Sequence, residues 1–256
     1  MHTYDRNYFK IALPAALEGL FMILLASTDL IMVGALGALS IAAVSIFLQP
    51  RLILLCFSRS LASSVTLLVS KKAGAGDTAG SADIMKKSLT LCAIFMGLLH
   101  ILFYIFLDDI FYLMGANDEY MAEAMAYGPI ALASVYVTSL TLILQAVQLG
   151  YGRTSVIMKT NVCGNVVNLA LNALLIFGFG PIPSLGVTGA AIGTLASTIF
   201  TLAWTAWILK NESFFYGGSY LPDRAYFHRI MPILLSILSE QGSERVGMVL
   251  FGRMAA

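Results

Sequence analysis

A carboxylate and several amides stand inside long apolar segments of this chain, where polar side chains are costly. Asp29 lies in the run ASTDLIMVG, and the apolar segment around it carries few other charges. A carboxylate at such a depth faces the interior of a helix bundle and by default marks a functional site. Four amides share one face of a later helix because they follow each other at i, i+4, i+7 and i+11: Asn161, Asn165, Asn168 and Asn172.

The chemistry that fits this set is the binding of a small hard cation. Amide oxygens together with one carboxylate suit Na⁺, and a desolvated carboxylate can carry a proton instead. Residues four apart lie one above the other on a helix, so we expect Asn168 and Asn172 to bind one ion together with Asp29. Thr194, on a glycine-rich segment, is a candidate for a further oxygen ligand. The alternative is that the amides only join helices through hydrogen bonds, which fits the first two of the four.

Further polar residues in apolar segments are candidates for contacts with a small-molecule substrate or for a cavity wall: Tyr136, Gln145, Glu240 and Arg59. Arg59 lies deep in its segment, where an arginine costs roughly 2.5–3.5 kcal/mol on insertion scales. The sequence leaves three alternatives for the Arg59 side chain: it pairs with a carboxylate, it extends to the membrane surface, or it lines a watery cavity. Glu240 and Glu244 share a helix face. Glu244 precedes Arg245 and suits an ion pair, so Glu240 is the better candidate.

Nothing in the sequence argues for catalysis. The stretch GAGD at residues 74–77 matches the G-x-G-D pattern of intramembrane aspartyl proteases. However, Asp77 lies in a lysine-flanked loop, and Asp29 lies at the wrong depth to be the second carboxylate of such an enzyme. The H-E-x-x-H, Ser-His-Asp and nucleophile-elbow patterns are missing. Three scattered cysteines form neither a disulfide framework nor a zinc site.

The elements that must position these residues are transmembrane helices. The chain has 256 residues, of which 59% are hydrophobic and only 11% charged, whereas about a quarter of a soluble domain is charged. We therefore predict an all-α, polytopic transmembrane helix bundle. The net charge of +1 and the lack of a basic stripe argue against a nucleic-acid partner. Seven apolar segments reach the roughly 20 residues needed to cross a bilayer: 12–35, 39–69, 88–107, 128–150, 156–178, 186–209 and 230–252.

Lysine and arginine residues predict the orientation. The segments before the first span and after the second, fourth and sixth hold 11 of the 15 basic residues, and the loops after the first, third and fifth hold none. The positive-inside rule then places the N-terminus in the cytoplasm, for a multi-pass protein of the inner or plasma membrane. The loop after the third span is acidic, which agrees with an outer position.

The seventh span resembles the first. Both begin with a proline and place a glycine twenty residues later, at Pro14 and Gly34 and at Pro232 and Gly252. This pattern predicts that a second copy of a six-span unit begins here. The predicted organisation is a six-helix N-terminal lobe, a cytoplasmic linker between lobes, and the first helix of a truncated C-terminal lobe: residues 1–210, 211–229 and 230–256.

Several stretches are similar to the multidrug and toxic compound extrusion (MATE) transporters. They are the first span from ALPAALEGLF onward, the loop LVSKKAGAGD, and the run from GYGRTSV to GVTGAAIGT that covers spans four to six. Pro232 followed by Glu240 also resembles the seventh helix of that family. The resemblance implies two six-helix lobes related by pseudo-two-fold symmetry around a central cleft. It also implies export of drugs or other small, often cationic, organic compounds, driven by Na⁺ or H⁺.

The resemblance further implies which residues act. The ion site of the family's first lobe falls on Asp29, Asn168 and Asn172, with a threonine at Thr194, and the acidic residue of its seventh helix falls on Glu240. Some members carry Asp where this chain has Asn172, which weighs against a proton relay there. No cofactor and no metal other than the coupling cation are expected. The implied partners are the lipid bilayer, a small-molecule substrate and the remaining C-terminal lobe.

Two alternatives stay open. The first is a flippase of the same superfold that moves lipid-linked precursors, which would need a strongly basic cavity for pyrophosphate. Arg51 and Arg59 are few for that task. The second is a truncated, transport-inactive chain or a structural partner, because five of the twelve expected spans are not in this sequence.

Overall fold

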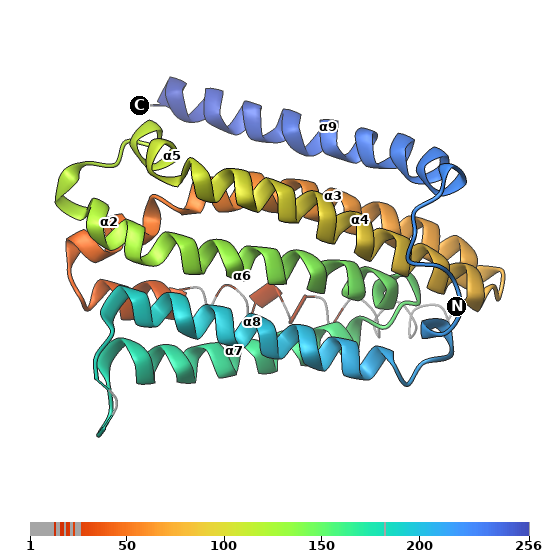
Figure 1. Cartoon of the computed structure of the whole chain (residues 1–256), viewed down its shortest axis with the longest axis horizontal. Helices are drawn as coiled ribbons and strands as arrows, with labels where there is room; N and C mark the ends of the chain where they lie inside the picture. The colour runs from red at the N-terminus through yellow and green to blue at the C-terminus, as the bar shows by residue number, and fades with distance from the viewer. Residues whose placement is uncertain are drawn as a thin grey trace.

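A computed structural model of the chain describes residues 27–181 and 183–255, together with residues 13, 16, 17, 19, 20 and 23. A helical segment at residues 27–34 precedes eight labelled α-helices and one short 3₁₀ helix (Figure 1). They are α2 (Ala38–Ser45), α3 (Leu48–Gly74), α4 (Thr78–Ile105), α5 (Leu107–Leu113), α6 (Asp118–Gly150), α7 (Thr154–Phe177), α8 (Gly186–Leu209), η1 (Ser213–Phe215) and α9 (Arg224–Ala255).

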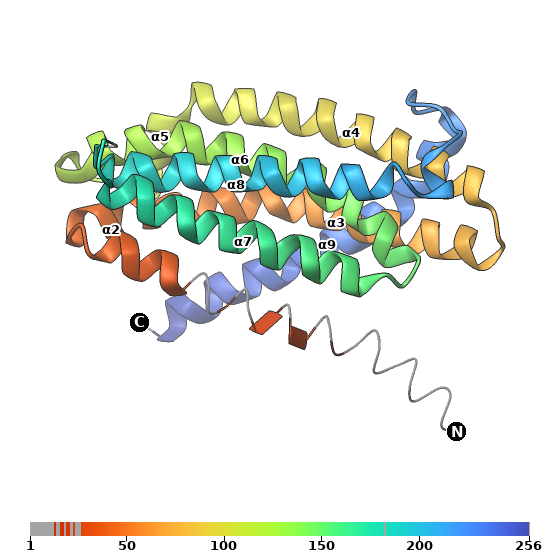
Figure 2. The ribbon, with the colours of Figure 1, turned by 90° about the horizontal axis from the view of Figure 1, so that it is seen from below.

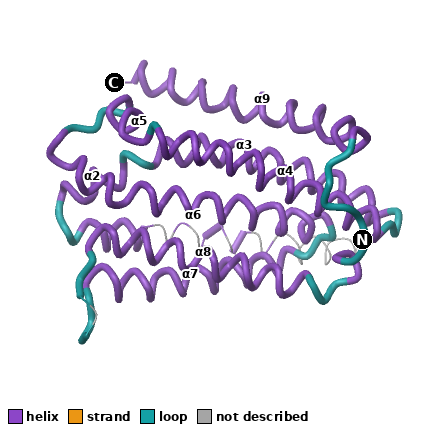
Figure 3. Tube along the Cα trace, in the orientation of Figure 1, coloured by secondary structure: helices purple, strands orange, loops and turns teal. Residues whose placement is uncertain are grey.

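The long helices lie side by side along the long axis of the molecule, and short loops join them at the two ends (Figures 1 and 3). Helix α6 is central because it contacts α2, α3, α4, α7 and α8. Helices α7 and α8 pack against each other on one side of α6, and α9 lies along α3 on the other side. The view in Figure 2 shows the same bundle from below, with α7 next to α8. The described part confirms the predicted all-α bundle.

Five helical stretches are long and apolar enough to cross a membrane, and they correspond to the predicted second to sixth spans: Ala38–Gly74, Thr78–Ile105, Asp118–Gly150, Thr154–Phe177 and Gly186–Leu209. Of the predicted first span, 12–35, the structure describes residues 27–35 and six positions before them. The predicted seventh span lies within α9, which is not among these five. Polar positions such as Glu240, Gln241 and Glu244 lower the apolar character of that helix.

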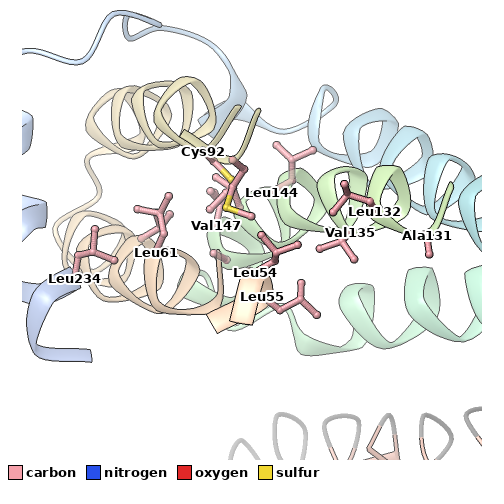
Figure 4. Close-up of a cluster of buried hydrophobic side chains, with 14 of the residues drawn as sticks. Leu54, Leu55, Leu61, Cys92, Ala131, Leu132, Val135, Leu144, Val147 and Leu234 are labelled. Carbon is pink, nitrogen blue, oxygen red and sulfur yellow. The ribbon is translucent and has the colours of Figure 1, made fainter. Parts of the chain in front are cut away.

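The outer surface of the bundle is apolar, as a lipid-facing surface must be. On α4, large side chains at i, i+4, i+7 and i+11 form an exposed stripe on one helix face: Ile94, Leu98, Ile101 and Ile105. The interior is equally apolar, so burial alone does not distinguish the two sides. Helices α3, α4 and α6 supply most of the main buried cluster, and Leu234 of α9 joins it (Figure 4).

The predicted second span is broken. It was expected as one helix over 39–69, but α2 ends at Ser45 and α3 begins at Leu48. Pro50 explains the position of the break, because proline has no N–H to continue the α-helical ladder but fits in the first turn of a new helix. Arg51 therefore lies in the first turn of α3 rather than in the middle of a straight span.

Asp77 caps a helix. Its carboxylate accepts a hydrogen bond of 2.7 Å from Gly80 N–H at the start of α4 and pairs with Lys72 Nζ at 2.6 Å. These two contacts hold the pKa of the Asp77 carboxyl below its usual range, Lys72 having the larger effect. Side-chain oxygens satisfy the free N–H groups of a first helical turn. Asp77 is thus a structural residue of a polar turn, in agreement with the interpretation of GAGD as a loop.

The predicted linker is folded onto the lobe. Helix α9 begins at Arg224, inside the range 211–229 that was expected as linker. Lys87 of α4 lies between two carboxylates, with its Nζ 2.7 Å from Asp83 and 2.8 Å from Asp223 of the linker. The buried Tyr226 Oη is 2.8 Å from Ser88 Oγ. These contacts attach the start of α9 to α4.

Candidate functional site

The candidate site forms where the 27–34 segment meets α7 and α8. A small buried cluster of Val33, Ile176 and Ala190 holds these three elements together. Asp29, half-buried, lies on the first of them. The Asn172 Nδ2 of α7 donates a hydrogen bond of 3.0 Å to Asp29 Oδ1. The carboxylate predicted from the first span and an amide predicted from the fifth are therefore in direct contact.

Asn168 lies one helical turn before Asn172 and is also buried. In one orientation of its carboxamide, Oδ1 accepts from Asn172 Nδ2 and Nδ2 donates to Thr194 Oγ1, both at 3.3 Å. When the carboxamide is turned by 180°, Nδ2 donates to the two Asp29 oxygens at 3.2 and 3.0 Å, and Oδ1 accepts from Ser197 Oγ at 3.2 Å. We favour the turned orientation because a carboxylate accepts hydrogen bonds, and it then meets donors on both oxygens.

Helix α8 closes the site. Thr194 Oγ1 donates to Ala190 O of its own helix at 2.9 Å. Ser197 Oγ lies 2.9 Å from Thr194 O, and its single hydrogen goes to Asn168 Oδ1 when the Asn168 carboxamide is turned. Both hydroxyls keep lone pairs that can face the site. The two helices approach closely because small residues lie between them. A Cβ atom added to Gly189 would lie only 2.6 Å from Leu175 C.

Charge and hydrogen bonding decide what this site can do. Asp29 is its single carboxylate in the described part of the chain, and Arg51 is close enough to interact with it electrostatically. The other groups are neutral amides and hydroxyls, which add oxygen atoms without adding charge. A site of one negative charge with several neutral oxygens suits one monovalent cation or one proton.

A polar cavity of about 210 Å³ lies between helices α3, α6, α7 and α8. Its lining combines two arginines, three amides and four threonines with two leucines: Arg51, Arg59, Gln145, Asn161, Asn165, Thr138, Thr141, Thr198, Thr201, Leu55 and Leu142. A second cavity of about 450 Å³ shares Arg59, Leu142 and Gln145 with the first and reaches Gln241 of α9. Pockets for small molecules usually combine apolar walls with a few polar groups, and the smaller cavity has more polar side chains than that.

The structure brings four predicted residues together at the site: Asp29, Asn168, Asn172 and Thr194. Gln145 and Arg59 lie together in the cavities instead. Gln145 Nε2 donates to Asn161 Oδ1 at 2.6 Å, so Asn161 forms the interhelical hydrogen bond that was expected of it. The expected face of four amides is thus divided between the candidate site at Asp29 and a cavity wall.

Two predicted residues lie elsewhere. Tyr136 faces α4, where its Oη donates to Ala93 O at 3.3 Å and its ring meets the His100 ring edge to face, with centroids 5.6 Å apart. It therefore lies in a helix interface and does not line either cavity. Glu240 is exposed on α9, whereas its neighbour Gln241 lines the larger cavity.

Several residues of the site and of the cavity wall were not among the predicted site residues. Ser197 is buried and contacts Asn168, and Thr198 and Thr201 line the smaller cavity. A signal for them exists in the sequence, because Thr194, Thr198 and Thr201 follow at i, i+4 and i+7 on one helix face. Hydroxyls are common in membrane helices as packing residues, which hides this signal.

Comparisons of the sequence with known proteins give consistent matches. The family model described as MatE matches residues 14–174. A probable multidrug resistance protein NorM of Rhizobium meliloti (strain 1021) is 26% identical over 259 residues, which cover 98% of this chain and 55% of that protein. An FAD transporter of Shewanella oneidensis is 27% identical over 210 residues, which cover 80% of this chain and 45% of that protein.

Solved structures share the fold. A MATE protein in the bent conformation superimposes with a TM-score of 0.85 at 24% identity, over 96% of this chain and 55% of that one. A MATE protein in complex with Br-NRF gives a TM-score of 0.77 at 23% identity, over 95% of this chain and 56% of that one. The chain thus spans about half the length of the relatives and structures that it matches.

Proposed function

Because this chain belongs to the MatE family of membrane transporters, we propose that it forms the N-terminal lobe of a cation-coupled exporter of small organic compounds. It is a multi-pass membrane protein and not an enzyme. The observation that carries the proposal is the contact of Asp29 with two buried amides of α7 at the junction of three helices. A cation that binds at this junction neutralises the buried charge between the three helices.

Coupling follows from the chemistry of Asp29. Na⁺ and H⁺ compete for one carboxylate, so binding of either neutralises it. Thr194 supplies a neutral oxygen, and Asn168 can present either its N–H groups or its oxygen, depending on the orientation of its carboxamide. We propose that Asp29, Asn168, Asn172 and Thr194 together form the coupling site, with Na⁺ as the preferred ion because no second carboxylate accompanies Asp29 in the described residues.

The substrate is proposed to occupy the cavities beside this site. Together they offer apolar walls, amides and hydroxyls from four helices. Gln241 of α9, the first helix of the expected second lobe, lines the larger one. A cavity that one lobe only half encloses requires the other lobe to complete it. We therefore propose that transport needs a C-terminal lobe in addition to this chain. We also propose that the basic loops of this chain lie in the cytoplasm.

A second candidate is export of an anionic compound. Arg51 and Arg59 both line the smaller cavity, and no carboxylate does so among the described residues. The similarity to a relative named as an FAD transporter supports the same direction, because FAD is an anion. The flippase alternative would use the same arginines for the phosphates of a lipid-linked precursor.

The test of the coupling site uses the two tryptophans of the chain as reporters. Trp204 and Trp207 both lie on α8, the helix that carries Thr194. We expect NaCl, but not choline chloride at equal ionic strength, to change the fluorescence of the purified chain with saturation. Asp29→Asn should abolish that change, and Asp118→Asn, an exposed carboxylate outside the site, should leave it intact. Equal Na⁺ responses of Asp29→Asn and the wild type would refute the proposed site.

A further inference from the structure

The Asn172 carboxamide is held from two sides. Its Nδ2 donates to Asp29 Oδ1 at 3.0 Å. Its Oδ1 is buried and accepts no hydrogen bond within the described part of the chain, although the whole residue is only 2% exposed. Buried amide oxygens are nearly always hydrogen-bonded, so an exception needs a physical reason.

Gly193 of α8 supplies that reason. A Cβ atom added to Gly193 would overlap Asn172 Oδ1 and would lie 3.2 Å from Asn172 N and 3.3 Å from Asn172 Cγ. The oxygen thus occupies the space that any other residue at position 193 would fill. Contact with the Gly193 backbone leaves no room there for a donor side chain or for sideways movement of the carboxamide.

We infer that Gly193 is a positioning residue of the proposed cation site: it fixes the Asn172 carboxamide with its N–H groups toward Asp29. The inference rests on the proposed function and refines it. Asn172 then acts as a donor that orients the carboxylate, and Thr194 remains to offer a neutral oxygen atom to the ion. A group held in one orientation by its surroundings binds better than one that must be ordered on binding.

The other glycines of α8 have different surroundings. A Cβ atom at Gly189 would meet the backbone of Leu175, and one at Gly186 would lie 3.8 Å from a Leu36 side-chain atom. Among the three, only Gly193 contacts a side chain of the proposed site. Gly189→Ala therefore perturbs the packing of α7 on α8 without touching the Asn172 carboxamide, which makes it the matched control for a purely structural effect.

The experiment is a double-mutant cycle between Gly193→Ala and Asn172→Ala in the purified chain. Na⁺ affinity is read from the tryptophan fluorescence of α8, and the thermal unfolding midpoint is read in Na⁺-free buffer. Gly193→Ala alone is expected to lower the Na⁺ affinity roughly tenfold or more, as is typical of a perturbed buried contact. In the Asn172→Ala background it should change the affinity by less than about twofold, because the oxygen that the new methyl group would displace is gone. Gly189→Ala should lower the unfolding midpoint, and its effect on the Na⁺ affinity should be smaller than that of Gly193→Ala.

Each outcome decides the inference. Wild-type Na⁺ affinity in folded Gly193→Ala would overturn it, and so would an equal loss in both backgrounds, since the effect would then come from helix packing. If Gly193→Ala does not fold, the inference requires that the double variant folds, and a double variant that also fails would overturn it.

Lack of any Na⁺ response in the wild type would contradict the proposed function instead. The contact would still be tested in Na⁺-free buffer, where additive losses of stability would overturn the inference and non-additive losses would support it.

Discussion

Asp29 and Asn172 stand 143 positions apart in the chain, yet Asn172 Nδ2 donates a hydrogen bond of 3.0 Å to Asp29 Oδ1. The contact joins the first helical segment to α7, and Asn168 and Ser197 extend it to α8. A hydrogen bond to an ionised group is worth about 1.5–3 kcal/mol, more than a neutral one. This pair therefore combines a structural role with control over the carboxylate that is proposed to bind the coupling ion.

Asn172→Ala should lower the Na⁺ affinity roughly tenfold or more, because the loss of a charge-assisted hydrogen bond leaves Asp29 less well oriented. Apparent Na⁺ affinity should also fall as the pH decreases, since protons compete for the same carboxylate. Both are measured by Na⁺ titration of the tryptophan fluorescence over a range of pH. Asn161→Ala is the control, because Asn161 bonds to Gln145 at the cavity wall. Lower stability with an unchanged Na⁺ response in Asn172→Ala would indicate that the amide only joins helices.

Arg59→Gln should weaken the binding of an anionic dye more than that of a cationic dye of similar size. Arg59 lines both cavities, and the loss of one positive charge from their wall acts with opposite sign on the two ligands. We would measure the binding of fluorescein and of rhodamine 6G by fluorescence anisotropy, with Arg224→Gln at the start of α9 as the control. A parallel change for both dyes would argue against charge selection in these cavities and against the second candidate function.

Lys71 and Asp118 should lie on opposite sides of the membrane, with Lys71 in the cytoplasm. Helices α3 and α6 run parallel, because Thr66 Oγ1 contacts Ala146 O, late in both helices. The end of α3 and the start of α6 are therefore at opposite ends of the bundle (Figure 1). In a variant without native cysteines, a membrane-impermeant reagent added to intact cells should label Asp118→Cys and not Lys71→Cys. The reverse pattern would invert the predicted orientation.

Asp223 should stabilise the chain at neutral pH and lose that effect in acid. Lys87 Nζ, and then the N–H of Tyr226, hold the pKa of the Asp223 carboxyl below its usual range. A carboxyl whose pKa is lower in the folded state contributes stability above its unfolded-state pKa of about 3.9, and loses it as the pH falls through the lower folded-state value. The unfolding midpoint of Asp223→Asn should therefore be lower than that of the wild type at pH 7, and the difference should vanish in strong acid.

The control for this prediction is Asp109→Asn, which removes an exposed carboxylate that is distant in sequence from Asp223. A difference between Asp223→Asn and the wild type that stays constant from pH 7 to pH 3 would show that the Lys87 ion pair does not stabilise the linker. The Lys87 side chain is 6% exposed and also contacts Asp83, so Asp223→Asn still leaves the Lys87 ammonium paired with one carboxylate.

The sequence by itself determined the class of protein and much of the candidate site. Long apolar segments with few charges can be stable only as membrane helices, since every backbone polar group must bond within its own helix. The spacing of Asn168 and Asn172 placed them on one face, and the apolar surroundings of Asp29 required a polar partner for it. These are properties of a single helix, so periodicity and composition reveal them without knowledge of the neighbours.

Only the tertiary structure decided which faces meet. The four asparagines of α7 share one stripe, yet Asn172 contacts Asp29 whereas Asn161 bonds to Gln145 across a different interface. Tyr136 was expected at a substrate site, and the rotation of α6 turns it toward α4 instead. The contact of Gly193 with Asn172 depends on how closely α8 approaches α7. Rotation and separation of helices follow from how their side chains interdigitate, and that packing is a property of helix pairs which no single segment of the sequence carries.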